Sequence, residues 1–295
     1  MPKLLTRGQY IKKAKMRRII MKLISKAFLK PKSRLSGKEI FIDTEFGKVR
    51  ALGYGFENPE KAPLFFDLHG GGFVFGNAEM DETMNIEFNR QIGCKIISID
   101  YAKAPENPYP AAVNQIYAVV RHFYENAEKY RIDPRRMAIG GHSAGANLST
   151  VTCLKAKKEG RFQFACQLLD YPPLDLATSP LDKPQPDGCI PPEMAMMFDA
   201  CYISPSQAKD LYVSPVYAAK EDLEGLPPAL LILAGKDSLH DEGLKYYGML
   251  KAAGVAAELC EYPMAFHGFT YKPSADTTDA LVKMAAFLKK YLYNF

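Results

Sequence analysis

Short apolar runs alternate with helical patterns along most of the chain. Clear examples of these runs, each of strand length, lie at residues 94–99, 164–169 and 229–235. Apolar strands separated by helices are typical of a parallel sheet that is buried on both faces. The pattern therefore predicts an α/β fold with a mostly parallel central sheet and helices on both faces.

Two segments depart from this alternation. Residues 38–56 alternate apolar and polar positions around a Phe-Gly turn, which predicts an antiparallel hairpin at one edge of the sheet. Residues 174–213 are rich in proline and contain one helical run, so they predict a cap segment inserted between the two parts of the core, 39–173 and 214–295. We expect one structural domain overall.

The first 38 residues are strongly basic. They hold 13 Lys and Arg and no Asp or Glu, and since the whole chain carries +5, the remainder carries −8. Apolar residues recur in this segment at helical spacing: Met16, Ile19, Ile20, Leu23, Ile24, Ala27 and Phe28. A basic amphipathic helix of this kind packs on the protein as a cap, or lies on an anionic membrane or a nucleic acid. We favour the cap, keep membrane-surface contact as the alternative, and expect no nucleic-acid partner.

Composition narrows the classes of protein to which the chain can belong. A chain of 295 residues with 47% hydrophobic residues can bury one large core. The six cysteines show no paired spacing such as CxxC, so we expect neither a metal site nor a disulfide framework. No stretch approaches about 18 uncharged apolar residues, and lysines interrupt the first apolar stretch, unlike a secretory signal. We expect a cytoplasmic protein.

Two short motifs carry the candidate chemistry: HGGGF at residues 69–73 and GHSAG at residues 141–145. Either motif alone is a weak signal, but in this order they correspond to the two halves of an acyl-transfer site. Ser143 lies between an apolar strand and a helix, where a sharp turn exposes its Oγ at the sheet edge. The backbone N–H groups that can converge there on one oxyanion are those of Gly71, Gly72 and Ala144.

A base and an orienting acid follow in the order Ser, Asp, His that an α/β-hydrolase requires. Asp237 comes directly after a continuous apolar strand, and His267 lies in the loop beyond the next strand. We therefore predict that His267 activates Ser143 and that Asp237 orients His267. Asp241 and Glu242 are rival acids, but they suit the start of the following helix, where carboxylates are favourable.

The other histidines suit other roles. His122 lies in a helical stretch and is expected on its surface, while His69 at the mouth of the glycine loop is expected to anchor that loop. His142 precedes the nucleophile, so its side chain should point away from Oγ. His240 is too close to Asp237 in sequence to reach the serine.

With these residues in place, the chain resembles the hormone-sensitive-lipase group of α/β-hydrolases, the bacterial carboxylesterases related to acetyl esterase. The resemblance runs from about residue 63 to the C-terminus. It is carried by HGGGFVFG, DYAKAPENPYPAA, GHSAG, Tyr171-Pro172, Ser214-Pro215-Val216, GLPPALLILAGKDSLHDEG and HGF. It implies the same triad of Ser143, Asp237 and His267, the same oxyanion hole, and a helical cap that includes the N-terminal segment.

Three positions depart from that group's pattern. His142 stands where the group has the Asp of GDSAG, Ala102-Lys103 replaces a segment with arginine, and Ser238 replaces the proline of DPL. None of these is a proton-transfer residue. The first two change packing and charge near the serine turn, so they affect the expected pH optimum more than the expected activity.

We expect a serine carboxylesterase that hydrolyses short- to medium-chain acyl esters through an acyl-enzyme, without metal or cofactor. The alternatives are a deacetylase of acetylated sugars or other small acetyl esters, and a catalytically silent small-molecule-binding protein, which the presence of His267 disfavours. A flexible acyl chain would suit a pocket lined by Phe73, Met194, Met197, Phe198 and Tyr202, although methionines and aromatics at helical spacing more often serve plain packing. The sequence leaves the oligomeric state open.

Overall fold

The computed structural model describes residues 4–28 and 36–293, with the backbone alone for residues 21–28. Its strands are β1 Lys38–Thr44, β2 Gly47–Tyr54, β3 Ala62–Leu68, β4 Lys95–Asp100, β5 Ile132–His142, β6 Cys166–Asp170, β7 Ala229–Lys236 and β8 Ala257–Phe266. Its α-helices are α1 Arg7–Phe28, α2 Glu82–Ile92, α3 Ala111–Glu125, α4 Ala127–Tyr130, α5 Ala144–Glu159, α6 Pro192–Tyr202, α7 Lys220–Leu223, α8 His240–Ala252 and α9 Ala275–Tyr293.

Eight strands of the described chain form one sheet in the order β1-β2-β4-β3-β5-β6-β7-β8. The pairs from β4 through β8 are parallel, whereas β1 and β2 pair antiparallel with each other and β2 pairs antiparallel with β4. The predicted mostly parallel sheet and the hairpin at its edge are therefore both confirmed. Each parallel connection requires a crossover, and helices supply several of them.

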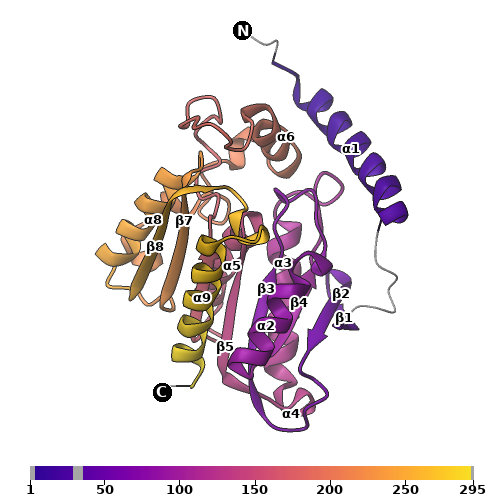
Figure 1. Ribbon diagram of the computed structural model, residues 1–295, viewed down its shortest axis with the longest axis vertical. Helices are drawn as coiled ribbons and strands as arrows, with labels where there is room; N and C mark the ends of the chain where they lie inside the picture. The colour runs from indigo at the N-terminus through magenta and orange to yellow at the C-terminus, as the bar shows by residue number, and fades with distance from the viewer. Residues whose placement is uncertain (1–3, 29–35, 294–295) are drawn as a thin grey trace.

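Helices cover both faces of the sheet (Figure 1). Strand residues alternate between two buried clusters: Leu64 and Phe66 of β3 belong to one, and Phe65 belongs to the other. The first cluster also contains side chains of α3, α5 and α8, and the second contains side chains of α2 and α9. This double burial explains why the central strands are apolar at almost every position.

The segments at residues 174–213 and α1 lie beyond one end of the sheet, with α6 and α1 side by side (Figure 1). Buried Tyr10 and Ala14 lie on the side of α1 that packs inward, and Arg7 Nε donates to the Ala200 carbonyl at 3.0 Å. The inserted segment thus contacts the N-terminal helix directly.

The apolar stripe predicted for α1 does not pack as expected. Met16, Ile19 and Ile20 are 56%, 61% and 48% exposed, so the expectation that they pack on the body is wrong. The buried side chains of this helix are instead Tyr10 and Ala14, which lie closer to the N-terminus. The side chains of the remaining stripe residues lie outside the described part of the chain. None of the described helices has the length and apolarity needed to cross a membrane.

Candidate active site

Ser143 occupies a strained turn between β5 and α5. Its backbone has φ 53° and ψ −119°, a conformation that costs a non-glycine residue on the order of 1–3 kcal/mol. The turn presses against the end of β3, because a Cβ on Gly145 would lie 1.8 Å from the Leu68 carbonyl oxygen and one on Gly141 would lie 2.2 Å from it. Both positions therefore require glycine, and this close approach holds Ser143 at the carboxyl edge of the sheet.

A hydrogen-bond chain joins Ser143 to two other strand ends. The Nε2 atom of His267 lies 2.9 Å from Ser143 Oγ, and its Nδ1 lies 2.6 Å from Asp237 Oδ2. Asp237 is buried at the end of β7 and accepts a further bond from the Leu239 N–H at 3.2 Å. The rival Asp241 is exposed and lies 3.2 Å from His240 instead. The structure thus brings together the three residues that the sequence order indicated.

The glycine loop leads from β3 to the same edge. Gly71, Gly72 and Phe73 all have positive φ, at 122°, 59° and 63°, and the Gly71 carbonyl accepts from the N–H groups of the third and fourth residues after it. Within the described residues, no hydrogen bond uses the N–H of Gly71, Gly72 or Ala144. A Cβ on Gly72 would lie 2.4 Å from the Phe198 ring, so α6 packs directly on this loop.

His142 belongs to a buried charged cluster behind the serine turn. Its Nδ1 lies 2.6 Å from Asp170 Oδ2, so the side chain points away from Ser143 Oγ, as the sequence suggested. Burial lowers the pKa of His142, but the carboxylates of Asp81, Asp170 and Asp67 outweigh burial and raise it to about 9. The imidazole is therefore a cation near neutral pH, and it sits beside acids whose own pKa values burial raises.

The same cluster contains the one group of described side chains that could share a metal ion. The ligand atoms of Asp67, Asp81 and His142 lie within 4.8 Å of one another. Protein groups already bond each of the three residues: Asn85 and Ser98 donate to Asp67, Tyr271 donates to Asp81, and Asp170 bonds His142. Asp81 Oδ2 is buried without a hydrogen-bond partner among the described residues.

The remaining histidines lie away from the serine. His69 is buried, its ring stacks on Tyr101 at a centroid distance of 4.2 Å, and the Tyr101 hydroxyl donates to the His69 carbonyl. Burial lowers the pKa of His69 to about 3, so it anchors the glycine loop as a neutral ring. His122 contacts the Tyr130 hydroxyl on α4, and His240 contacts Glu261 on β8.

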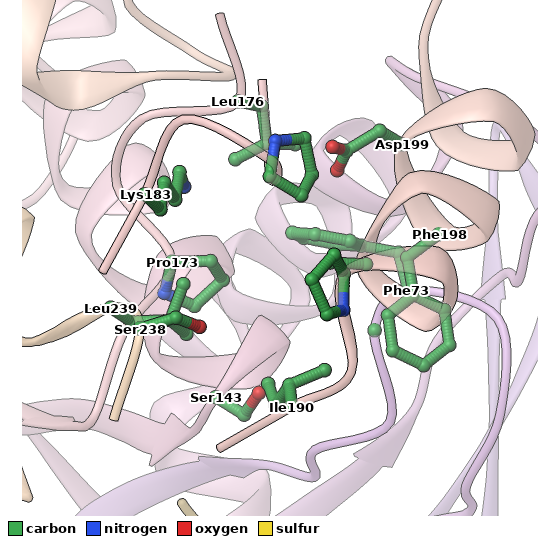
Figure 2. A pocket seen from close by; sticks show the side chains of 14 residues that line it. Phe73, Ser143, Pro173, Leu176, Lys183, Ile190, Phe198, Asp199, Ser238 and Leu239 are labelled. Atoms are coloured by element: carbon green, nitrogen blue, oxygen red, sulfur yellow. The ribbon is translucent and has the colours of Figure 1, made fainter. Parts of the chain in front are cut away.

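A narrow cavity of about 50 Å³ opens above Ser143 (Figure 2). Of the residues predicted to line a pocket, Phe73 and Phe198 line this cavity. Met194, Met197 and Tyr202 do not, and the last two are buried in the core, where Tyr202 stacks on Phe73 at 3.9 Å. The methionine run on α6 is therefore mainly packing.

Sequence reasoning missed several residues of the cavity wall. Pro173, Leu176, Pro180, Ile190 and Pro192 supply apolar surface, while Lys183, Asp199 and Ser238 supply polar groups. Asp199 alone has a detectable sequence signal, as an acid inside an otherwise apolar helical stretch. Apart from Pro192, which begins α6, the others lie on irregular chain whose path no periodicity predicts.

Known proteins resemble this chain in sequence and fold. The sequence pattern of the alpha/beta hydrolase fold family matches residues 65–271. The chain is 33% identical to the carboxylic ester hydrolase LipN of Mycobacterium tuberculosis, over 84% of this chain and 68% of LipN, and 33% identical to the carboxylesterase NlhH of the same species, over 71% and 67%. A thermostable esterase from Pseudomonas putida superposes with a TM-score of 0.85 at 27% identity, over 96% of this chain and 91% of that one. An esterase from Pyrobaculum calidifontis superposes with a TM-score of 0.79 at 29% identity, over 97% and 94%. The chain therefore belongs to the α/β-hydrolase fold family, among the esterases that resemble hormone-sensitive lipase.

Proposed function

We propose that this carboxylic ester hydrolase works through a covalent acyl-enzyme on Ser143. The observation that carries the proposal is the unbroken hydrogen-bond chain from Ser143 Oγ through His267 to Asp237, with distances of 2.9 and 2.6 Å. A serine hydroxyl is a weak nucleophile, and an adjacent base within hydrogen-bond reach is what activates it. Related proteins named as esterases support the same reaction class.

Each of the three residues in this hydrogen-bond chain has a defined task. His267 Nε2 removes the Oγ proton as Ser143 attacks the ester carbonyl, then donates that proton to the departing alcohol. Asp237 holds the imidazole in orientation through Nδ1 and stabilises its cationic form. Water, deprotonated by His267, then attacks the acyl-enzyme and releases the carboxylic acid.

The negative oxygen of each tetrahedral intermediate requires fixed donors. The N–H groups of Gly71, Gly72 and Ala144 are unused within the described residues and lie on the two backbone segments that meet at Ser143. We assign these groups to the oxyanion hole. No step of this mechanism involves a metal or cofactor.

We further propose that residues 1–38 and 174–213 act as a two-part cap that limits substrate size. The cavity at Ser143 holds only about 50 Å³ and is walled by α6 and the irregular chain before it. That volume favours soluble esters with short to medium acyl chains, about C2 to C8, and it suits the small acetyl esters of the alternative assignment equally well.

A chain-length series of 4-nitrophenyl esters tests this function, with Ser143→Ala as the matched control. We expect the highest kcat/KM between C2 and C8, a steep fall for longer chains, and loss of nearly all activity in the control. Best rates on emulsified long-chain triglyceride would contradict the proposed size limit. Undiminished hydrolysis by the control would contradict the proposed nucleophile.

A further inference from the structure

One carboxylate in the catalytic cavity has no partner. Asp199 on α6 lines the cavity that contains Ser143, and Figure 2 shows its carboxylate directed away from the helix toward the cavity interior. Within the described residues, no hydrogen bond or ion pair reaches this carboxylate. A carboxylate that is half-buried without a partner is unfavourable, and such groups in a binding cavity are commonly satisfied by a ligand.

The neighbouring charges do not satisfy Asp199. Lys183 is the cation on the same cavity wall, but its Nζ already donates to Glu242 Oε2 at 2.6 Å and to the Asp175 carbonyl at 2.7 Å. Glu242 in turn accepts from the Leu174 N–H at 2.6 Å. The Asp175 side chain accepts the N–H groups of residues 177 and 178 and a threonine hydroxyl. Three carboxylates thus surround one lysine, and only that of Asp199 faces the cavity without a bond.

Asp199 also stands where two cavities meet. A second cavity of about 370 Å³ lies between α1 and α6, and it shares Asp199, Leu176 and Pro180 with the cavity at Ser143. Asp199 therefore lines both cavities. The larger cavity has the volume that the catalytic one lacks.

We propose that Asp199 selects esters that carry a positive charge a few atoms from the ester carbonyl. This inference rests on the proposed serine esterase function and specifies its substrate class. A cationic group at this position would supply the missing partner of Asp199 and offset the excess of carboxylates around Lys183.

Pairs of esters with the same shape and different charge test the proposal. Acetylcholine and 3,3-dimethylbutyl acetate differ only by a quaternary nitrogen in place of a carbon on the alcohol side. Ethyl betaine and ethyl 3,3-dimethylbutanoate differ in the same way on the acyl side. In the wild type we expect a cationic-to-neutral ratio of kcat/KM at least about tenfold above that of Asp199→Asn for one of the two pairs. Comparing the two proteins cancels the intrinsic reactivity of each ester.

A control on the same helix separates this effect from general charge. Glu193→Gln removes an exposed carboxylate of α6 that does not line the cavity at Ser143, and it should leave the wild-type ratio intact. Equal ratios in the wild type and Asp199→Asn for both pairs would overturn the proposal. If the wild type hydrolysed neither neutral ester, the proposed esterase function itself would fail, which is a different result.

The wild type alone gives a second test that does not depend on the variant folding. Burial raises the pKa of Asp199 to about 7, with Lys183 opposing and Glu242 and Asp175 adding to the shift. The charge that attracts a cation therefore develops between about pH 6 and 8. Because the titration of the triad is common to both esters of a pair, it cancels in their ratio. The ratio should rise over this range for the preferred pair, and a flat ratio would contradict the proposal.

Discussion

At the scale of single residues, the catalytic groups and their support have separate tasks. Ser143 sits in a strained backbone conformation that the tight contact of two glycines with Leu68 imposes. His267 and Asp237, which we propose as its base and acid, come from two other strand ends, so three rigid strands fix their distances. His142, immediately before the serine, takes no part in the hydrogen-bond chain and instead joins the buried charges behind it.

The assignment of the acid predicts different effects at two neighbouring aspartates. Asp237→Asn should lower kcat by about 10³- to 10⁴-fold, because the amide no longer favours the tautomer that His267 needs. Asp241→Asn should change kcat within about twofold, because Asp241 is exposed and, among the described side chains, forms a polar contact only with His240. Steady-state kinetics on one soluble ester measures both. Similar losses at the two positions would show that the acid has been misassigned.

The buried imidazolium of His142 predicts a pH-dependent contribution to stability. Its folded-state pKa of about 9 lies above its ordinary value of 6.5. The contribution is therefore complete below pH 6.5, declines as pH rises, and is lost above about pH 9, with an upper limit of roughly 3 kcal/mol. Urea unfolding of the wild type and His142→Gln should show a larger deficit in the variant at pH 6 than at pH 9.5. An equal deficit at both values would mean that His142 is neutral in the folded protein.

At the scale of elements, two helices fix the glycine loop. The Phe198 ring on α6 packs on Gly72, and Arg18 on α1 donates to the Val74 carbonyl at 2.8 Å and also contacts the Ala104 carbonyl and Glu106. The N-terminal helix is thus linked to the glycine loop by a polar side chain. The exposed Met16, Ile19 and Ile20 have no share in that link.

This packing predicts a specific cost for a methyl group on the loop. Gly72→Ala should lower kcat/KM by about 10²- to 10³-fold, because the Cβ meets the Phe198 ring and shifts an oxyanion donor. Adding Phe198→Ala should restore part of the activity by removing that clash. Gly248→Ala on α8, where a Cβ meets nothing within 4 Å, is the matched control and should keep full activity. Full activity in Gly72→Ala alone would argue against the loop's proposed role.

At the scale of the whole molecule, the sequence predicted those features that depend on hydrophobic periodicity and on the order of residues along the chain. Buried strands, the edge hairpin, the serine turn and the meeting of Ser143, Asp237 and His267 all follow from apolar runs and from which residue ends each strand. The cap was harder to predict, because irregular segments have no hydrophobic periodicity that would indicate which side chains are buried. The α1 stripe faced outward and Met197 turned into the core, since both depend on where α6 lies and not on the helix pattern itself.

Ser143 is the residue proposed to carry the acyl group, and trapping with a fluorophosphonate tests this assignment most directly. Intact mass and peptide mapping should show one adduct per chain on Ser143, with activity lost in proportion to labelling. His267→Ala should label far more slowly, because without its base the serine stays protonated. Complete inactivation with the adduct on another residue, or with no adduct on Ser143, would contradict the account.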